Sequence, residues 1–243
     1  MIKITKIQIF LSHFILVVIT LLLSFASFAQ NPPLVFSQTP LGENFSCADN
    51  ALTNAYKNLN YDINFLTLPS KRSLKEANSG NVDGEMLRAI GVEKRYPNLI
   101  HVPIVLCSVE SVLLANKAVT INSLADLKNY RIGITTGYVD QENIARKYNL
   151  NVMRAAKDEI LQIMLLRDRV DIIFSTEQKA HTLLQKYQDN EKYNIYKVKT
   201  LNRKIDLYHY IHKKHQAILP MLTEELKKLS QSGLIDTSQR TNQ

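Results

Sequence analysis

Residues 122–138, with the sequence NSLADLKNYRIGITTGY, constrain the fold of this chain more than any other stretch. Ser123 and Asp126 stand three residues apart, which is the spacing of an N-cap and its capping-box partner, so they predict a short helix over residues 124–128. Residues 131–135 alternate and are rich in β-branched side chains, which predicts a strand, and residues 139–148 predict a second helix. The order helix, strand, glycine turn, helix is typical of an α/β sheet.

The turn between that strand and the second helix contains Thr136, Gly137 and Tyr138. In an α/β sheet such a turn lies at the carboxyl end of a strand, where free backbone N–H groups and the positive end of the helix dipole face a crevice. The turn is therefore a candidate place to hold an anionic group. A glycine that is present only because the turn needs a left-handed residue is the alternative.

The first 29 residues have the pattern of a secretory signal peptide. Lys3 and Lys6 precede an apolar run over residues 14–23, and Ser27 and Ala29 supply small residues at the positions that signal peptidase reads. Cleavage after Ala29 leaves 214 of the 243 residues. We expect an exported protein in the periplasm of a Gram-negative bacterium. An uncleaved N-terminal membrane anchor is the alternative, because the apolar region could cross a thin bilayer.

The charge and the cysteines limit the partners and the compartment. The formal net charge of +8 falls to +6 once Lys3 and Lys6 leave with the signal peptide. The remaining basic residues are dispersed and are not interleaved with aromatic residues, so we expect no nucleic-acid binding. Cys47 and Cys107 are the two cysteines, and in an oxidising compartment they can form a disulfide. Two buried thiols are the alternative.

Strands and helices alternate through the first part of the mature chain. Residues 99–106 form an extended segment that Pro103 keeps from being a central strand. The other predicted elements are strands at residues 34–38, 61–68 and 82–85 and helices at residues 43–59 and 70–79, with Gly80 ending the second helix. The pattern is βαβαβ, which indicates a first α/β unit.

The alternation then repeats after an extended run over residues 107–116. Residues 170–174 form a near-continuous apolar run, as expected of a strand buried on both faces. The remaining predicted elements are strands at residues 151–154, 193–198 and 207–211 and helices at residues 157–167 and 177–187. Two α/β units fit the mature length better than one core.

The last predicted helix, at residues 218–229, is amphipathic, ends before Gly233 and has no βαβ partner nearby. Its apolar stripe must be buried, so we expect it to return to the first unit. Two connections between the units then form a hinge beside a cleft. We place the first lobe at residues 30–106 and 207–243 and the second lobe at residues 107–206.

Several motifs together resemble a known family. They are LPSKRSL, SGNVDGEMLRAI, YPNLIHVPI, SLADLKNYRIGITTG, LLRDRVDIIF and the closing KKHQAILPML. In this order they resemble the extracellular solute-binding proteins of family 3, the periplasmic receptors of ABC importers for amino acids and other small polar solutes. The resemblance implies a type II periplasmic-binding-protein clamshell with two lobes, each a doubly wound sheet with flanking helices, and a ligand between the lobes.

The sequence departs from the family's amino-acid receptors at the expected site. Arg95 has the spacing of the arginine that holds the ligand carboxylate in those proteins. Leu87, Arg88 and Ile90 stand where those proteins have hydroxyl donors, and Thr176 stands where they have the aspartate that holds the ammonium group. These departures count against an ordinary α-amino acid pocket.

Charged residues near the predicted cleft suit an anionic or zwitterionic solute. Arg72 opens a helix, Glu85 and Arg88 follow the third strand, and an arginine offers a hydrogen-bonding fork to a carboxylate. An Arg–Glu pair that only ties loops together is the alternative, and Tyr138 on the opposite lobe is otherwise a surface tyrosine. The ligand-binding residues that we predict are Arg72, Glu85, Arg88, Thr136, Gly137 and Tyr138.

Other polar residues give little support to catalysis or metal binding. His209, His212 and His215 suggest a metal site, but residues 209 and 212 of a strand point to opposite faces, so one site would need a helix here. Asp171 lies in so apolar a strand that we expect a structural role. The sequence contains no nucleophile elbow, P-loop or zinc motif, so we expect no cofactor, no metal and no catalytic residue.

We expect this chain to capture a small polar solute, either amino-acid-like or anionic, between two lobes that close by hinge rotation. The expected partner is an inner-membrane ABC permease, and the protein is expected to be a monomer. Two alternatives stay open. One is a ligand-sensing partner of a membrane receptor kinase, and the other is a dehydratase-like enzyme on the same fold, for which Glu85 is the candidate acid or base.

Overall fold

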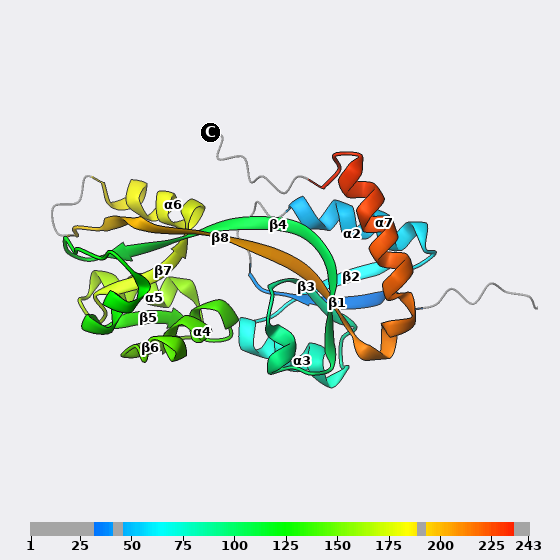
Figure 1. Cartoon of the computed structure of the whole chain (residues 1–243), viewed down its shortest axis with the longest axis horizontal. Helices are drawn as coiled ribbons and strands as arrows, with labels where there is room; N and C mark the ends of the chain where they lie inside the picture. Colours follow the sequence, from blue (N-terminus) through cyan, green and yellow to red (C-terminus); the bar gives the residue numbers. More distant parts are fainter. Residues whose placement is uncertain (1–31, 41–45, 189–192, 236–243) are drawn as a thin grey trace, which may run out of the picture. The chain divides into compact units, whose positions relative to one another are not determined.

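In the computed structural model, two 17-residue strands, β4 (Leu99–Ala115) and β8 (Tyr196–His212), run antiparallel beside each other (Figure 1). The structure describes residues 32–40, 46–188 and 193–235, without the side chains of residues 46, 47, 199 and 200. Within these residues, eight strands form one sheet in the order β2-β1-β3-β8-β4-β7-β5-β6. The two long strands are therefore shared by the groups of strands on either side of them.

The first lobe is built on β1 (Leu34–Gln38), β2 (Ile63–Thr67) and β3 (Gly84–Ala89). β1 pairs in parallel with β2 and β3, and β3 pairs antiparallel with β8. Side chains of α2 (Ser46–Asn58) and α7 (Leu219–Gln231) share one core cluster with this sheet, and side chains of α3 (Ser70–Ser79) share another with η1 (Val92–Lys94). The sheet of this lobe thus has helices on both faces.

The second lobe repeats the arrangement with β5 (Ile132–Thr135), β6 (Val152–Ala155) and β7 (Ile172–Thr176). β5 pairs in parallel with β6 and β7, and β7 pairs antiparallel with β4. One core cluster contains α4 (Val139–Lys147) and η2 (Leu124–Asn129), and the other contains α5 (Asp158–Leu166) and α6 (Glu177–Tyr187). The predicted fold of two lobes, each a doubly wound α/β sheet, is confirmed.

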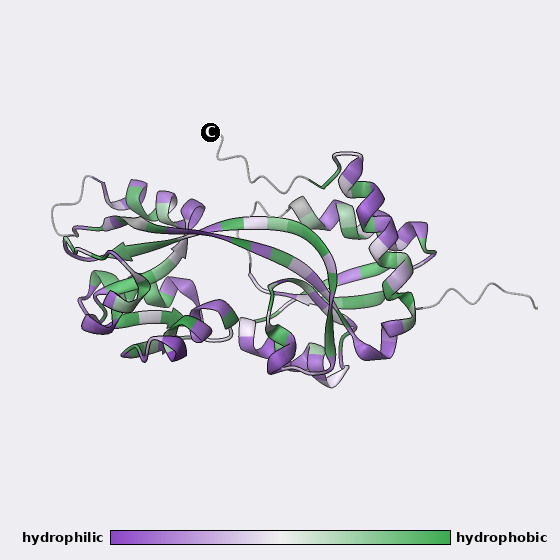
Figure 2. Ribbon diagram, in the orientation of Figure 1, coloured by the Kyte–Doolittle hydropathy of each residue, from purple (hydrophilic) through white to green (hydrophobic). Residues whose placement is uncertain are grey.

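Hydropathy explains this layering. In Figure 2 the strands of each lobe carry much of the hydrophobic colour, and the helices alternate between hydrophobic and hydrophilic stripes. Ile132, Ile134 and Ile172 of the second lobe are completely buried, as the apolar runs of residues 131–135 and 170–174 predict. Burial of such side chains is the dominant favourable contribution to folding.

Local hydrogen bonds fix the stretch that the sequence singles out. The predicted capping box is present, because Asp126 Oδ2 accepts from the backbone N–H of Ser123 at 2.9 Å, and the short helix that it begins is a 3₁₀ helix. Arg131, at the start of the next strand, donates to both carboxylate oxygens of Asp171, at 3.1 and 2.8 Å. These hydrogen bonds hold the pKa of Asp171 well below its usual range. Asp171 therefore has the structural role that we predict.

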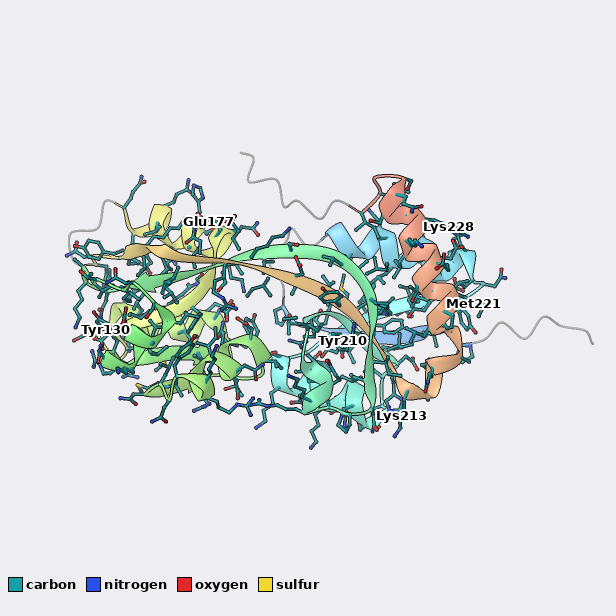
Figure 3. The ribbon with its side chains drawn as sticks, viewed as in Figure 1. Tyr130, Glu177, Tyr210, Lys213, Met221 and Lys228 are labelled. Atoms are coloured by element: carbon teal, nitrogen blue, oxygen red, sulfur yellow. The ribbon has the colours of Figure 1, made fainter. Side chains whose placement is uncertain are left out.

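The closing helix α7 packs on the first lobe. Leu222 and Leu226 are completely buried in one cluster with Ala48 and Leu52 of α2. Met221 and Lys228 lie on the outer side of the helix in Figure 3, and Met221 is 52% exposed. The chain thus returns to the first lobe, while the exact lobe boundaries at residues 106/107 and 206/207 stay predictions.

Three strand predictions are wrong in their extent. The strands predicted at residues 99–106 and 107–116 are parts of one strand, β4, which ends at Ala115. The strands predicted at residues 193–198 and 207–211 are parts of one strand, β8, which begins only at Tyr196. β3 begins at Gly84 and continues to Ala89 instead of covering residues 82–85. Pro103 is tolerated because the pairing of β4 with β8 is irregular between His101 and Val105. The register with β7 begins only at Ser111, beyond the proline.

Two predictions concern residues or side chains that the structure does not describe. The signal peptide, residues 1–29, lies outside the described residues and stays a prediction. In the part of the chain that the structure describes, no helix is both long enough and apolar enough to cross a bilayer. Cys107 is buried and disulfide-bonded, but the side chain of Cys47 lies outside the described residues, so their pairing also stays a prediction.

The three histidines lie in three different environments. His209 is completely buried, with Tyr56 Oη 2.9 Å from Nε2 and the Met86 carbonyl oxygen 3.1 Å from Nδ1. His212 Nδ1 accepts from the backbone N–H of Lys214, and His215 Nε2 lies 2.6 Å from Asp83. Among the described residues no three His, Cys, Asp or Glu side chains form a metal-ligand group.

We predict that Leu222→Ala lowers the free energy of unfolding by about 2–5 kcal/mol, because it leaves a cavity between α7 and the core of the first lobe. Met221→Ala on the same helix is the control and should change stability by less than about 0.5 kcal/mol, because Met221 is largely exposed. Urea unfolding measures both values. Equal effects of the two substitutions would contradict the docking of α7.

We predict a pH-dependent stability that depends on His209. Burial lowers the pKa of His209 to about 4 in the folded state, against about 6.5 in an unfolded chain. Between these values the unfolded chain binds a proton that the folded protein does not, so stability falls with decreasing pH, by up to about 1.4 kcal/mol per pH unit. Above pH 6.5 this contribution does not change.

Urea unfolding at pH 7.5, 5.5 and 4.5 tests this prediction. Whatever His209→Gln costs at pH 7.5, the difference from wild type should shrink as the pH falls, because the variant lacks the titrating group. His181→Gln, at an exposed position of α6, should follow the wild-type profile. Parallel profiles for wild type and His209→Gln would rule out the buried neutral imidazole.

Candidate functional site

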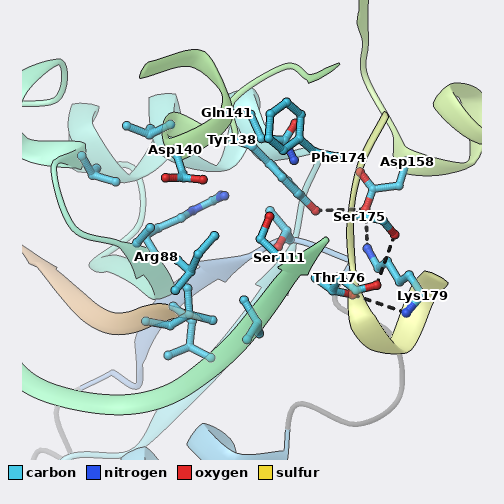
Figure 4. Close-up of a pocket in the computed structure, with 18 residues that line it drawn as sticks. Arg88, Ser111, Tyr138, Asp140, Gln141, Asp158, Phe174, Ser175, Thr176 and Lys179 are labelled. Atoms are coloured by element: carbon cyan, nitrogen blue, oxygen red, sulfur yellow. Dashed lines mark hydrogen bonds and ion pairs between the residues drawn. The ribbon is translucent and has the colours of Figure 1, made fainter. Parts of the chain in front are cut away.

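A pocket lies between the lobes, beside the middle of β4 and β8, with a cavity volume of about 120 Å³ (Figure 4). Strand ends from both lobes and the first turns of α4, α5 and α6 contribute to it. Its polar lining residues are Thr39, Arg88, Ser111, Tyr138, Asp140, Gln141, Asp158, Ser175, Thr176 and Lys179. Its apolar lining residues are Leu87, Ala89, Val92, Val109, Val139, Phe174, Ile205 and Leu207.

A β-bulge positions Arg88. Residues three apart in a regular strand point to opposite faces, so Glu85 and Arg88 should not meet. The pairing with β8 shifts between them, because Glu85 is opposite Tyr210 and Arg88 is opposite Tyr208. One extra residue in β3 therefore brings both side chains to the same side. There Arg88 Nη2 donates to Glu85 Oε1 at 3.0 Å.

The Arg88 side chain is held in place at the edge of the pocket. Its Nη1 donates to Ser70 Oγ at 2.7 Å, and its Nη2 also donates to the Ser70 carbonyl oxygen at 3.3 Å, at the start of α3. The side chain is 8% exposed. Its buried Nε has no hydrogen-bond partner among the described residues. A guanidinium has five N–H donors, so Arg88 has N–H groups that Ser70 and Glu85 do not use.

Glu85 lies behind Arg88 and does not line the pocket. It is completely buried, and burial raises its pKa above the ordinary value although the ion pair with Arg88 opposes this shift. Glu85 therefore positions the guanidinium. A general acid or base must reach its substrate, so this placement removes support from the enzyme alternative.

In the second lobe, Asp158 is the centre of a hydrogen-bonded group at the start of α5. Tyr138 Oη donates to Asp158 Oδ2 at 3.4 Å, and Lys179 Nζ forms a short ion pair with the same oxygen (Figure 4). Thr135 Oγ1 donates to Asp158 Oδ1. Burial by itself lowers the pKa of Lys179, but Tyr138 and Asp158 raise it overall. Burial also raises the pKa of Tyr138. Lys179 is thus a stable cation and Asp158 already has three donors.

The other acid of the pocket, Asp140, is also neutralised. It lies in the first turn of α4, and its two carboxylate oxygens accept from Arg203 of β8 at 3.2 and 2.9 Å. Such a two-pronged contact is stronger and more directional than a single ion pair.

A second cavity, of about 180 Å³, adjoins the Tyr138–Asp158–Lys179 group. The two cavities share these three residues and Thr39 as lining. The second is also lined by the starts of α3 and α5, including Ser70 and Lys157. The group therefore belongs to the lining of both cavities.

The predicted site residues are only partly brought together. Arg88 and Tyr138 line the pocket. Arg72 does not line either cavity; its side chain is 67% exposed and pairs with Glu76 at 3.7 Å. Thr136 and Gly137 do not line the cavities either, so the turn in which they lie contributes only Tyr138.

Gly137 instead brings the two lobes into contact. Its φ is +92°, and a Cβ atom there would lie 2.6 Å from the backbone nitrogen of Lys71 and 2.9 Å from the carbonyl carbon of Ser70. The turn thus lies directly against the first turn of α3. A glycine is required for both the positive φ and the close approach.

Two further contacts accompany that of Gly137. Arg95 Nη1 donates to Glu142 of α4 at 3.0 Å, so the arginine at the family's carboxylate-binding position joins the lobes and does not line the pocket. Val139 belongs to the same core cluster as Leu74 of α3. The lobes therefore contact each other through α3, η1 and α4.

Sequence reasoning missed several lining residues. Asp158 follows β6 directly, so the rule that ligands bind at the carboxyl ends of strands gives a signal for it. Lys179 and Asp140 lie in the first turns of α6 and α4, and a charged residue there has no signal of its own. Ser111 lies in the middle of β4, where alternation alone does not show which face meets a ligand. Thr176 lines the pocket at the position that the resemblance indicates.

Comparison with known proteins places this geometry in context. No model of a known protein family matches the chain. A Shewanella oneidensis protein described as uncharacterized is 26% identical over 223 residues, which cover 86% of this chain and 82% of that protein.

Among solved structures, the substrate-binding protein of an amino acid ABC transporter has a TM-score of 0.64 and 16% identity, covering 84% of this chain and 96% of that chain. The arginine-, lysine-, histidine-binding protein ArtJ of Geobacillus stearothermophilus has a TM-score of 0.65 and 15% identity, covering 83% and 91%. A histidine kinase sensor domain similar to periplasmic binding proteins has a TM-score of 0.68 and 13% identity, covering 84% and 92%. These likenesses show the fold, which is the two-lobed type II fold of periplasmic substrate-binding proteins.

We predict that Gly137→Ala lowers the free energy of unfolding by roughly 2–4 kcal/mol, because the new Cβ adds a clash with the start of α3 to the strain of a positive φ. Gly233→Ala is the control, since Gly233 also has a positive φ but nothing lies within 4 Å of a Cβ there. The control should cost roughly 1–2 kcal/mol. Urea unfolding with equal costs for both variants would show that the lobes do not approach so closely in solution.

Proposed function

We propose that this chain is a periplasmic solute-binding protein that captures a small polar solute between its lobes and delivers it to an inner-membrane ABC permease. The observation that carries the proposal is the pocket whose charged lining comes from both lobes, with Arg88 on the first and Lys179 on the second. A ligand that contacts both residues stabilises the arrangement in which the lobes are close. The fold, shared with substrate-binding proteins, supports the same function.

The ligand-binding residues that we propose are Arg88, Tyr138, Ser111, Thr176 and Lys179, all of which line the pocket. Glu85 positions Arg88, and Gly137 lets the lobes approach. Arg72 and Thr136 are not part of this set, because they lie outside both cavities. The lobes are residues 30–106 with 207–243 and residues 107–206, and the two crossing strands form the hinge.

The signal-peptide pattern of residues 1–29 supports export to the periplasm, and the enclosed pocket suits a monomer that binds one solute. Removal of a small ligand from water on closure, with a few hydrogen bonds, is sufficient for micromolar affinity, which corresponds to about 8 kcal/mol.

A second candidate partner is a membrane sensor kinase. The likeness to a histidine kinase sensor domain, at a TM-score of 0.68, supports a fold that can report ligand binding. Uptake of labelled ligand by cells that lack this protein separates the two roles. Loss of uptake supports import, and normal uptake with a lost transcriptional response supports sensing.

We predict that one class of small polar solute raises the melting temperature of the purified protein. A ligand at 100 times its Kd adds about 2.7 kcal/mol to the free energy of unfolding, which raises Tm by roughly 5–11 °C for a chain of this size. Thermal unfolding followed by calorimetric titration against amino acids, short peptides, organic acids and polyamines measures this effect. Absence of a Tm shift and of heat with every class would contradict the proposed function.

A further inference from the structure

Among the described residues that line the pocket, no carboxylate is free for an ammonium group. Asp140 is held by both prongs of Arg203, and Asp158 already accepts from Thr135, Tyr138 and Lys179. An α-amino acid needs an acceptor for its ammonium, and burying that group without one is unfavourable. Each acid of this pocket would have to give up an existing cation to supply it.

The pocket does provide a place for a carboxylate. Arg88 is nearly buried, has a donor without a partner, and is held rigidly by Ser70 and Glu85. A fixed guanidinium with free N–H groups matches the planar geometry of a carboxylate. Ser111 and Thr176 line the same cavity and add hydroxyl groups.

The rest of the lining suits an apolar body. Leu87 of β3, Phe174 of β7 and Leu207 of β8 belong to the eight apolar residues around the cavity, and the first two are at most 5% exposed. The cavity volume of about 120 Å³ is slightly less than that of an engineered protein cavity of about 150 Å³ that holds benzene. This space fits about four to six carbon atoms.

We propose that this pocket takes a small monocarboxylate with an apolar body of about four to six carbon atoms, and that it discriminates against the corresponding α-amino acid. Arg88 binds the carboxylate, and the apolar lining from both lobes encloses the carbon chain. The inference rests on the proposed function and names the substrate class of the same site. It departs from the amino-acid binding of the structurally similar receptors.

Matched ligands test the inference on the full chain. 4-Methylpentanoate and leucine differ only by the α-ammonium group, and 4-methylpentan-1-ol lacks the carboxylate. We expect 4-methylpentanoate to bind at least about tenfold more tightly than leucine, because the ammonium finds no free carboxylate among the described lining residues. We expect the alcohol to bind about 10- to 100-fold more weakly than the carboxylate, because it loses charged hydrogen bonds to Arg88. Calorimetric titration measures all three affinities.

Variants assign the carboxylate contact. Arg88→Met combined with Glu85→Gln removes both members of the buried pair, so neither is left as an unpaired charge. This double variant should lose about 10- to 100-fold in affinity for 4-methylpentanoate. Arg72→Gln removes an arginine outside the cavities and is the control for a general loss of positive charge. Thermal unfolding checks that each variant is folded.

Each outcome separates this inference from the proposed function. Leucine binding as tightly as 4-methylpentanoate, or the alcohol binding as tightly as the carboxylate, overturns the inference and leaves a solute-binding protein. Binding of polyamines or peptides without carboxylates has the same meaning. If no ligand class gives heat on titration, both the inference and the proposed function are overturned. If the double variant does not fold, the comparison of the three ligands on the wild-type protein still decides.

Discussion

The structure depends on the pairing of β4 with β8. The two strands extend through both lobes, and their register runs from Leu99 with His212 to Ala115 with Tyr196. Each lobe adds its own strands to this pair, so β4 and β8 are the two connections between the lobes. Their backbone hydrogen bonds hold these two connections side by side. The pairing is irregular at three places, between His101 and Val105, Val105 and Cys107, and Ser111 and Leu113. Such irregularities bend and twist a strand pair, so we propose them as the location of the hinge.

The site follows from where these strands place charged groups. Arg88 reaches the pocket because β3 contains one extra residue relative to β8, and Glu85 is brought beside it by the same bulge. The acids of the second lobe are already neutralised by Arg203 and Lys179. A buried arginine with a free donor therefore remains as the group that we propose to select a ligand. This charge arrangement distinguishes the pocket from one built for an ammonium and a carboxylate together.

Much of the fold could be predicted from the sequence because its signals are local. The bounds of β1, α3 and α6 agree with those predicted, and Gly80 and the capping box of Ser123 and Asp126 mark helix ends through hydrogen bonds among near neighbours. The length of β4 and β8 could not be predicted, because pairing between strands about 100 residues apart, as in the Ser108–Asp206 hydrogen bond at 2.6 Å, overrides a proline and polar interruptions. The sequence predicts Arg88 and Tyr138 as site residues from their positions after strands. It does not predict Lys179 and Asp140, because their place in the pocket depends on how the helices that carry them pack.

Hydrogen–deuterium exchange of the full chain, with and without the tightest ligand of the solute panel, tests the central claim most directly. The account predicts that the ligand protects segments of both lobes, namely residues 84–89 of β3 and residues 135–141 and 172–179 around β5, β7 and the first turns of α4 and α6. Protection confined to one lobe, or protection that leaves all of these segments unchanged, would contradict a solute held between the lobes.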